Sequence, residues 1–583
     1  MAFTPMSSLV GDARQPSSRI HDPPDMELLI EHICSDPFQD TDLQQTEDGT
    51  PFQRIPSEGD RGFHKHSLRI KQILESHFRH FIFSVVVTDL GARLLRWDRS
   101  GVVVTASFDH TTNDNPLLHF LWRFDHLSDD QRGRDTTVSY PSEDEATLAR
   151  VAFAASKHYT IPNNVPLRKV TVRDDVSKEE TSYAISTPQT SNDRLVGPCF
   201  GYLAVDLRDG SLVWMKDVWR QDSPSFWKEG DVYRRLHQSK VPHIPPLRSA
   251  GDVGSHVTRC QEFVHSSWNC VQMDLPTRRH YRLVLGAVGR PLNTFRSTRE
   301  LCTSVRDAVE AHAKTYKGLN ILHGDISVGN ILIDDDGHGL LIDWNLAFDA
   351  DNVREGPVIG TWPFMSGRLM EKANLQPVLS DDLESFLHVL VYQLASHRPT
   401  GVPCLAHDLE RVFSAGLREE EPFEMHMSKL AFFCHALLAQ KHLVGHLNEP
   451  CANLVGQLRE LFWRGIYSGS TVTPRSRKAA LKALQSPDRV LGLFNGALRK
   501  RAWPTNDGSI NAVAERRALL SRGSPTKEAK SSSFSASLSS SSSSSSGKRS
   551  AEFAFGDDAH SGSTTSGKRR RTSPQTSNAS GKA

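Results

Sequence analysis

The sequence has few cysteines, no long apolar run and almost no net charge. Eight Cys are scattered over 583 residues without a C-x-x-C pair, which argues against a zinc site or a disulfide framework and suits a reducing compartment. No apolar run approaches the roughly eighteen residues of a membrane-spanning helix, and we expect no signal peptide because the first residues lack an apolar core. A net charge of +1 gives no general attraction to nucleic acid or to membranes, so we expect neither as a partner.

Both ends of the chain are polar. Residues 1–60 mix Pro, Ser and acidic residues, and we expect them to be mostly disordered apart from one short helix at 26–34. Residues 503–583 contain a Ser tract and are expected to be disordered as well. A basic run near the end consists of Lys568, Arg569, Arg570 and Arg571. It predicts recognition by a nuclear import receptor, although such tails are often only solubilising, so we expect the protein in the nucleus or the cytoplasm.

Residues 61–190 predict a small α+β unit. HSLRIKQILESHFRH and PLLHFLWRF have apolar residues at helical spacing, whereas FIFSVVVTD and ARLLRWDRSGVVVTASF read as strands, the second with a turn at Asp-Arg-Ser-Gly. Trp97, Asp98 and Arg99 stand at that turn. They fit either turn chemistry with a packed Trp or a surface for a partner or regulator.

The most informative stretch is ILHGDISVGNILIDDDGHGLLIDWNLA at 321–347. ILI and LLI are apolar strand pieces, and DDDGHG between them supplies turn residues. Asp325 and Asn330 stand just before the first strand, and Asp343 follows the second. Because a hairpin of this length brings its two ends together, we expect the three side chains to meet. Two carboxylates and an amide form a hard-oxygen cage suited to Mg²⁺ and to the phosphates that it carries.

The spacing within this stretch is more informative than any one of its residues. A single loop Asp is most often a turn or cap residue. Here Asn330 follows Asp325 by five positions and Asp343 follows it by eighteen, which is the spacing of catalytic-loop Asp, metal-binding Asn and D-F-G Asp in protein kinases. His-Gly-Asp followed by Ile-Asp-Trp also resembles the aminoglycoside and choline phosphotransferases. The stretch therefore predicts phosphoryl transfer and leaves the acceptor open.

Upstream, residues 193–220 read as strand, loop, strand, Asp-Gly turn and strand, the order that opens a kinase N-lobe. The loop keeps only Gly197 and Gly201, where Gly would let backbone N–H groups approach phosphates. Lys216 lies on the third strand and is the candidate for contacting the α and β phosphates. Glu229 is the candidate carboxylate that positions Lys216, although Gly230 beside it makes that choice less certain.

A Gly-containing connector follows the buried strand at 279–285. Gly286 to Val288 is the expected interlobe hinge, whose backbone N–H and C=O would pair with an adenine edge. A long amphipathic helix is expected at 297–318, an apolar one at 379–394 and further helices at 400–500. This pattern predicts an α-rich second lobe.

Two later motifs favour protein kinases over small-molecule phosphotransferases. GTWPFMS at 360–366 resembles the end of a kinase activation loop, and SDDLESF at 380–386 resembles the start of the following helix in casein-kinase-like enzymes. Together with the motifs above, residues 61–500 resemble the fungal-type protein kinase family. The resemblance implies a bilobal α+β kinase fold, with a β-rich N-lobe and an α-rich C-lobe at 191–502 behind the 61–190 unit. It also implies ATP binding and transfer of phosphate to Ser or Thr of protein substrates that the sequence does not name.

The same resemblance assigns roles by position. Asp325 would be the catalytic residue that receives or orients the substrate hydroxyl, and Asn330 and Asp343 would hold Mg²⁺. Lys216 would grip the phosphates and Glu229 would hold Lys216. In addition, Asp382 would brace the catalytic loop through backbone N–H groups near His323, and Thr361 would line the loop where a peptide docks.

Three departures from the family pattern keep alternatives open. Gly324 replaces the Arg that often pairs with a phosphorylated activation loop, and Ser327 stands where Ser/Thr kinases keep a Lys. Asn345 replaces the D-F-G Gly, a position that needs an unusual φ. These changes predict slow or absent catalysis as one alternative, in which the chain is a pseudokinase scaffold. A small-molecule phosphotransferase is the other.

Overall fold

The computed structural model describes most of the chain between residues 58 and 509. The described residues are 2–4, 26–34, 36, 58–112, 116–191, 197–265, 275–352, 358–371, 375–397, 429, 433 and 447–509. Most of the predicted tails, the basic run at 568–571 and most of the helices expected between 398 and 446 lie outside the described residues. Among the helices that are described, none has the length and apolarity to cross a membrane.

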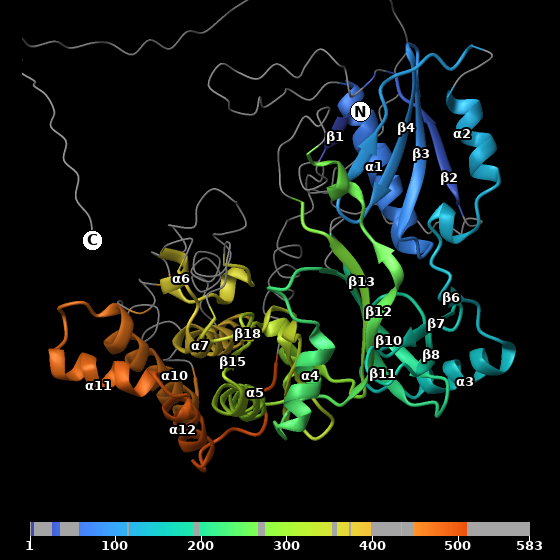
Figure 1. Cartoon of the computed structure of the whole chain (residues 1–583). Helices are drawn as coiled ribbons and strands as arrows, with labels where there is room; N and C mark the ends of the chain where they lie inside the picture. The colour runs from blue at the N-terminus through green and yellow to red at the C-terminus, as the bar shows by residue number, and fades with distance from the viewer. Residues whose placement is uncertain are drawn as a thin grey trace, which may run out of the picture. The chain divides into compact units, whose positions relative to one another are not determined.

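The first sheet comes from the N-terminal part of the chain and has the strand order β1-β5-β4-β3-β2. Its strands are β1 (Ala2–Thr4), β2 (Leu28–His32), β3 (Phe81–Thr88), β4 (Gly91–Asp98) and β5 (Val102–Val104). Two helices, α1 (Glu58–Ser76) and α2 (Pro116–Asp125), lie on opposite sides of it (Figure 1). Alternation in β3 explains this: Ile82 and Val86 pack with residues of α1, whereas Phe83 meets Phe120 and Phe124 of α2.

One predicted helix of this region is wrong. MELLIEHIC forms β2, which pairs in parallel with β3 from Leu28–Phe83 to His32–Val87. Nine residues with helical spacing are a weak signal, and the free edge of β3 offers a row of backbone hydrogen-bonding groups. Leu29 becomes buried there, so tertiary pairing decided against the helix.

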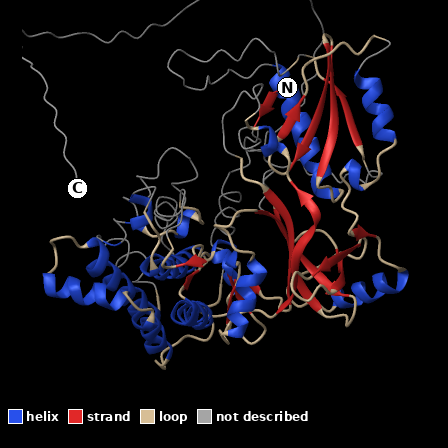
Figure 2. Cartoon of the chain, in the orientation of Figure 1, coloured by secondary structure: helices blue, strands red, loops and turns tan. Residues whose placement is uncertain are grey.

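The second sheet has the order β12-β13-β11-β10-β8-β7-β6, with β9 paired to β10. Strands are drawn in red in Figure 2. Its strands are β6 (Val138–Ser139), β7 (Arg168–Arg173), β8 (Glu180–Ile185), β9 (Thr190–Ser191), β10 (Cys199–Asp206), β11 (Leu212–Gln221), β12 (Leu247–Val257) and β13 (Arg278–Leu285). The predicted boundary between 190 and 191 therefore falls inside β9, a strand that pairs with β10. Residues 138–191 complete the sheet because Val170 and Val172 share an apolar cluster with Met215 and Val284.

Two helices flank this sheet, α3 (Glu143–Ala154) and α4 (Glu229–Gln238). Helix α3 begins at a capping box in which Ser142 and Glu145 satisfy each other's backbone N–H groups. Its Ala149 and Phe153 pack on Leu203 and Val205 of β10. The start of α3 is thus fixed by local sequence, and its position on the sheet by apolar burial.

The rest of the described chain is mainly helical. Its helices are α5 (Thr298–Leu319), α6 (Gly367–Glu371), α7 (Leu379–Ser396), α10 (Glu449–Phe462), α11 (Pro474–Leu484) and α12 (Asp488–Leu498). The strands are β14 (Arg290–Pro291), β15 (Ile321–Leu322), β16 (Ile331–Ile333), β17 (Gly339–Leu341) and β18 (Phe348–Asp349). Helices α5 and α7 form the centre of one large apolar core. The short β16–β17 hairpin packs on α5, so the stretch at 321–347 sits on a rigid base.

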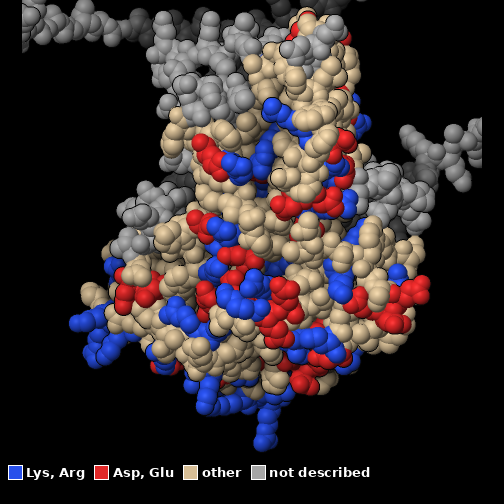
Figure 3. Space-filling model, turned by 45° about the vertical axis from the view of Figure 1, so that its right-hand side comes forward, with Lys and Arg blue, Asp and Glu red and all other residues tan. Residues whose placement is uncertain are grey.

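The turn at Trp97–Arg99 joins the two sheets. The Trp97 Nε1–H donates to Ser84 Oγ at 2.8 Å inside the first sheet. The Asp98 carboxylate accepts from the N–H of Ser100 and, at 2.7 Å, from that of Arg259 beyond the end of β12. The turn reading with a packed Trp is therefore confirmed, and the turn also contacts the second sheet of the same chain. A surface for a separate partner or regulator stays a prediction. Acidic and basic side chains are interspersed on the face seen in Figure 3, in keeping with the near-zero net charge.

Candidate active site

Lys216 lies between two carboxylates. Its Nζ is 2.8 Å from Glu229 Oε2 of α4 and 2.6 Å from Asp343 Oδ1. Lys216 is 8% exposed and Glu229 5%. Burial by itself lowers the pKa of Lys216, but the charges of Asp343 and Glu229 outweigh it and raise that pKa well above its ordinary value. Lys216 therefore stays an ammonium ion, and the predicted pairing of Lys216 with Glu229 is present.

Gly230 of α4 allows Glu229 to reach Lys216. A Cβ at Gly230 would come within 2.5 Å of both the Ala250 Cβ and the Tyr281 hydroxyl, and the Gly230 N–H donates to that hydroxyl at 3.0 Å. The missing side chain lets α4 approach β12 and β13 closely, and Glu229 then faces Lys216. The second oxygen of Glu229 accepts from the Trp344 N–H at 3.1 Å, so α4 is also tied to the residue after Asp343.

The β16–β17 hairpin gathers the other predicted residues. Ile331 faces Leu341 in its register, and the Ile342 N–H donates to the Asn330 carbonyl at 3.0 Å. The Asn330 Nδ2 donates to the Asp325 backbone oxygen at 2.7 Å and to Asp325 Oδ2 at 3.2 Å. Asp325 and Asn330 thus lie at the end of the hairpin where Asp343 follows, as the sequence predicted. Their catalytic and metal-binding roles stay predictions.

Thr361 holds Asp325 from the opposite side. Asp325 Oδ1 accepts from both the N–H and the hydroxyl of Thr361, each at 2.7 Å. Gly360 is next to this contact, because a Cβ there would lie 3.2 Å from the Gly324 carbonyl. The GTWPFMS segment therefore packs directly on the predicted catalytic residue.

Asp382, at the start of α7, supports the loop that carries Asp325. Its carboxylate accepts from the His323 N–H at 2.9 Å, from the Gly324 N–H at 3.3 Å and from His312 Nε2 at 2.8 Å. Burial raises the pKa of Asp382, but the hydrogen bond and charge of His312 outweigh it and leave that pKa below its ordinary value. The predicted brace is present.

The strained backbone position differs from the one expected. Asn345 is not among the residues with positive φ, whereas Asp343 has φ 65° and Gly324 has φ 77°. The left-handed residue of this segment is therefore Asp343, the carboxylate itself, and not Asn345 as expected. At Gly324 a Cβ would also lie 2.9 Å from the Leu346 carbonyl. An Arg at position 324 is therefore incompatible with this loop conformation.

The predicted phosphate loop is less open than expected. Gly201 is a strand residue that pairs with Lys216, and a Cβ there would meet Thr190 Oγ1 at 2.3 Å and the Trp214 ring at 2.5 Å. Gly197 has φ 60°, and its N–H donates to the Arg99 carbonyl at 3.2 Å. In this conformation both glycines accommodate protein neighbours, and the residues between 191 and 197 lie outside the described part.

The predicted hinge is partly engaged already. The Gly286 N–H donates to the Pro246 carbonyl at 2.7 Å, so it cannot also serve an adenine edge. Val288 packs on the apolar cluster of α3 and β10. Sequence reasoning missed Tyr159, whose hydroxyl donates to the Gly289 carbonyl of this connector at 3.3 Å. The signal for this contact was weak, because SKHY follows α3 some 130 residues before the connector.

Asn330 and Asp343 offer oxygen atoms of the kind that suits Mg²⁺. Asn330 directs its amide nitrogen at Asp325, which leaves its amide oxygen as the atom that can coordinate an ion. The Asp343 side chain is 29% exposed and thus accessible. Carboxylate and amide oxygens are hard ligands of the kind that Mg²⁺ takes. The donor set fits the predicted ion, and Asn330 and Asp343 stay its predicted ligands.

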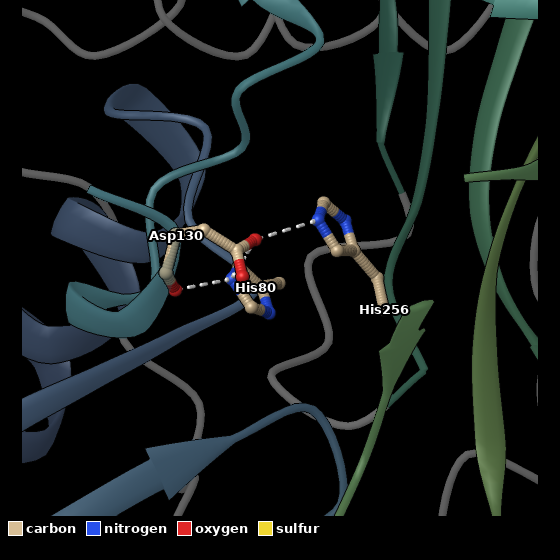
Figure 4. A group of neighbouring side chains, drawn as sticks. All are labelled: His80, Asp130 and His256. Atoms are coloured by element: carbon tan, nitrogen blue, oxygen red, sulfur yellow. Dashed lines mark hydrogen bonds and ion pairs between the residues drawn. The ribbon is translucent and has the colours of Figure 1, made fainter. Parts of the chain in front are cut away.

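A second group with metal-binding side chains lies between the two sheets (Figure 4). Asp130 Oδ1 is 3.7 Å from His80 Nε2 and 3.8 Å from His256 Nε2. The two rings stack, however, with centroids 4.1 Å apart and planes 7° from parallel. An imidazole binds a metal ion in the plane of its ring, and two stacked rings share no plane. This arrangement therefore suits neutral, packed histidines rather than a metal centre.

Comparison with known proteins adds to this geometry. A family model described as fungal protein kinase matches residues 67–394, more than half of the chain. The chain belongs to the fungal protein kinase family. A search of curated proteins found no match. Among solved structures, the ROP18 kinase domain in complex with AMP-PNP and sucrose matches with 13% identity and a TM-score of 0.33, covering 62% of this chain and 98% of that chain. The fold is protein-kinase-like, and membership of this family makes the protein a kinase-type phosphotransferase.

Proposed function

We propose that the protein is a Mg·ATP-dependent protein kinase that phosphorylates Ser and Thr of protein substrates. The observation that carries the proposal is the ion pair between Lys216 and Glu229 at 2.8 Å, since a kinase can act only when this strand–helix pair is formed. The nearby carboxylate of Asp343, 2.6 Å from Lys216, supports the proposal, because an ion that it bound would lie beside the phosphates that Lys216 would contact.

Asp325 is the residue proposed to orient the acceptor hydroxyl. Thr361 fixes its Oδ1 with two hydrogen bonds, whereas Oδ2 accepts only the longer 3.2 Å bond from Asn330 Nδ2 among the described residues, so Oδ2 is the oxygen proposed to accept the hydroxyl hydrogen. Lys216 orients the phosphates, and Glu229 holds its ammonium in place. Mg²⁺, when bound by Asn330 and Asp343, neutralises phosphate charge. Because the 360–366 segment contacts Asp325, the acceptor enters beside a stretch of backbone, which favours a peptide over an aminoglycoside or choline.

The second candidate is a pseudokinase scaffold. Ser327 favours it, because a Lys at that position in Ser/Thr kinases adds positive charge beside the transferred phosphate. Gly324 also favours the scaffold, because the conformation of this loop excludes the Arg that many kinases have at this position. A scaffold would keep the Lys216–Glu229 pair as a structural bond without turnover.

Transfer of labelled γ-phosphate to the protein itself or to a generic protein substrate tests the proposal. We expect Asp325→Asn to lower the rate about 10²–10⁴-fold, while Asp336→Asn, an exposed Asp in the β16–β17 turn, leaves it unchanged. Equal rates for the wild type and Asp325→Asn would remove Asp325 from the mechanism. Binding of Mg·ATP without transfer to any protein would favour the scaffold. Transfer only to amino alcohols or aminoglycosides would favour a small-molecule phosphotransferase.

A further inference from the structure

The register of β11 indicates where the base of a nucleotide would lie relative to Lys216. We call the space between Lys216 and the connector at 286–289 the nucleotide cleft, and its side nearer the connector the base end. Lys216 pairs with Leu283 of β13, and Trp214, two residues earlier on the same face, pairs with Leu285, the last residue before the connector. If Lys216 contacts phosphates, as the proposed function requires, the base lies towards Trp214 and the connector. Leu332 of β16 packs directly on this connector, because a Cβ at Gly289 would lie 2.8 Å from the Leu332 Cβ.

The chain's own residues reach into this corner. After α3 ends at Ala154, residues 155–163, here called the strap, run from the second sheet toward the helical lobe. The Tyr159 ring lies against the Trp214 ring with centroids 5.5 Å apart. Its hydroxyl donates to the Gly289 carbonyl at 3.3 Å. Tyr159 thus spans the distance from Trp214 to the connector, and a base paired with the connector backbone would need the same space.

The strap is fixed firmly at both of its ends. Phe153 of α3 is buried against β10, and Arg150 of α3 hydrogen-bonds to the carbonyls of Asn163 and Val165. These contacts keep the strap beside the cleft whether or not Tyr159 is in place.

The middle of the strap is held more weakly. Lys157 Nζ and His158 Nε2 each lie 2.7 Å from the Asp335 carboxylate in the β16–β17 turn. Lys157 is 71% exposed and Asp335 52%, and exposed ion pairs contribute little. The hydroxyl of Tyr159 makes one long hydrogen bond. His158 is 11% exposed, and Tyr159 and Ile161 are partly buried against the apolar cluster of α3 and β10. Since the polar contacts of the middle are weak and its apolar side chains are only partly buried, this part of the strap can open without unfolding α3.

We propose that the strap closes the base end of the nucleotide cleft and that Tyr159 must leave before a base can bind. The strap joins the second sheet to the hairpin that carries Asn330 and Asp343, so closing it also ties the two lobes together. A protein that binds only when the strap is open has an apparent Kd equal to its intrinsic Kd divided by the open fraction. The inference rests on the proposed function, since it places a nucleotide base in this corner.

Binding of Mg·AMP-PNP to the full chain tests the strap. We expect Tyr159→Ala to lower the apparent Kd about tenfold, and Asp335→Asn, which keeps the Tyr159 ring but removes its anchor, to lower it about threefold. Tyr140→Ala, an exposed Tyr of the same region, and Asp336→Asn are matched controls and leave the Kd unchanged. Hydrogen exchange of the wild type gives a second measurement, and Mg·AMP-PNP should raise exchange in residues 155–163.

The outcomes separate the strap from the proposed function. Unchanged or weaker binding in Tyr159→Ala, or protection of 155–163 by Mg·AMP-PNP, overturns the strap and leaves the kinase proposal standing, because nucleotide still binds. Failure of the wild type and both strap variants to bind Mg·AMP-PNP overturns the strap and removes the nucleotide site itself. Tighter binding that persists in a Tyr159→Ala and Lys216→Met double variant would place the nucleotide away from Lys216 and overturn both.

Discussion

Lys216 at the phosphate end of the cleft lies between two carboxylates, whereas Trp214, two residues earlier on the same strand, lies against the ring of Tyr159. The phosphate end is a set of buried, paired charges contributed by β11, α4 and the β16–β17 hairpin. The base end is an aromatic contact contributed by a segment that precedes the whole second lobe. Under the proposals above, the first arrangement would bind a charged ligand as it stands, whereas the second would have to move to admit an apolar ring.

This difference has an energetic side. Buried ion pairs lose several kcal/mol when one partner is removed, because the other charge stays buried. Exposed pairs such as that between Lys157 and Asp335 contribute at most about 1 kcal/mol. The phosphate end is therefore expected to be rigid and the base end to open readily. Three predictions test this contrast, in order of expected effect.

The largest effect is expected for Lys216→Met. It leaves the buried Glu229 carboxylate without its cation, so we expect a loss of about 3–5 kcal/mol in the free energy of unfolding, along with loss of Mg·AMP-PNP binding. Urea denaturation measures the first and a binding titration the second. The double variant Lys216→Met with Glu229→Gln removes the unpaired charge and should recover part of the stability. No recovery would mean that Glu229 is not charged in the folded protein.

An intermediate loss of stability is expected on acidification. It involves the histidines beyond the face of β11 opposite Lys216. Asp217 follows Lys216 there and hydrogen-bonds to His280 at 2.7 Å, and His280 Nδ1 lies 3.2 Å from His256 Nδ1. Burial lowers the pKa of His256 to about 4 and, together with the charge of His256, that of His80 to about 3. The neutral histidines stack between the two sheets. They are linked through His280 to Asp217 of β11, so the packing beside this strand depends on pH.

The sign of this dependence follows from the lowered pKa values. Both histidines take up protons more readily in the unfolded chain, at about 6.5, than in the folded one. Stability is thus full above pH 6.5 and falls as the pH drops toward 4, by at most about 2 kcal/mol per histidine at pH 5. Although burial raises the pKa of Asp135, Arg282 outweighs it and holds that pKa at about 2, so this neighbour stays charged throughout.

Urea denaturation at pH 7.5 and pH 5 measures the effect. His80→Phe keeps a ring in the stack without a titrating nitrogen and should lose less stability on acidification than the wild type. His126→Phe changes an exposed histidine of the first sheet's region and should behave as the wild type does. An identical loss in the wild type and His80→Phe would show that His80 does not contribute to the pH dependence.

The smallest effect on stability is expected for Asp335→Asn. Its partners Lys157 and His158 hold the strap through a side chain that is 52% exposed, so the free energy of unfolding should change by less than about 1 kcal/mol. Hydrogen exchange in residues 155–163 should nevertheless rise, because the strap opens without global unfolding. A loss of several kcal/mol would make the strap a structural element rather than a weakly held one, and would erase the contrast between the two ends.

The sequence alone predicted which residues gather around Lys216 and Asp325, while their roles stay predictions. Asp325, Asn330 and Asp343 are close along the chain, and the β16–β17 hairpin brings its two ends together. Lys216 and Glu229 were also found, because their order upstream of that hairpin matches a known pattern of strand and helix. The placement of Asp382 beneath His323 followed from the same pattern.

Only the tertiary structure decided the base end and the junction of the sheets. Tyr159 meets Gly289 across 130 residues, and His80 meets His256 across 176; no local spacing encodes either contact. The strand at Leu28–His32 and the assignment of residues 138–191 to the second sheet were likewise settled by pairing with distant strands. Local sequence fixes turns, caps and hairpins through short-range geometry, whereas these contacts depend on which apolar faces and strand edges meet once the whole chain has folded.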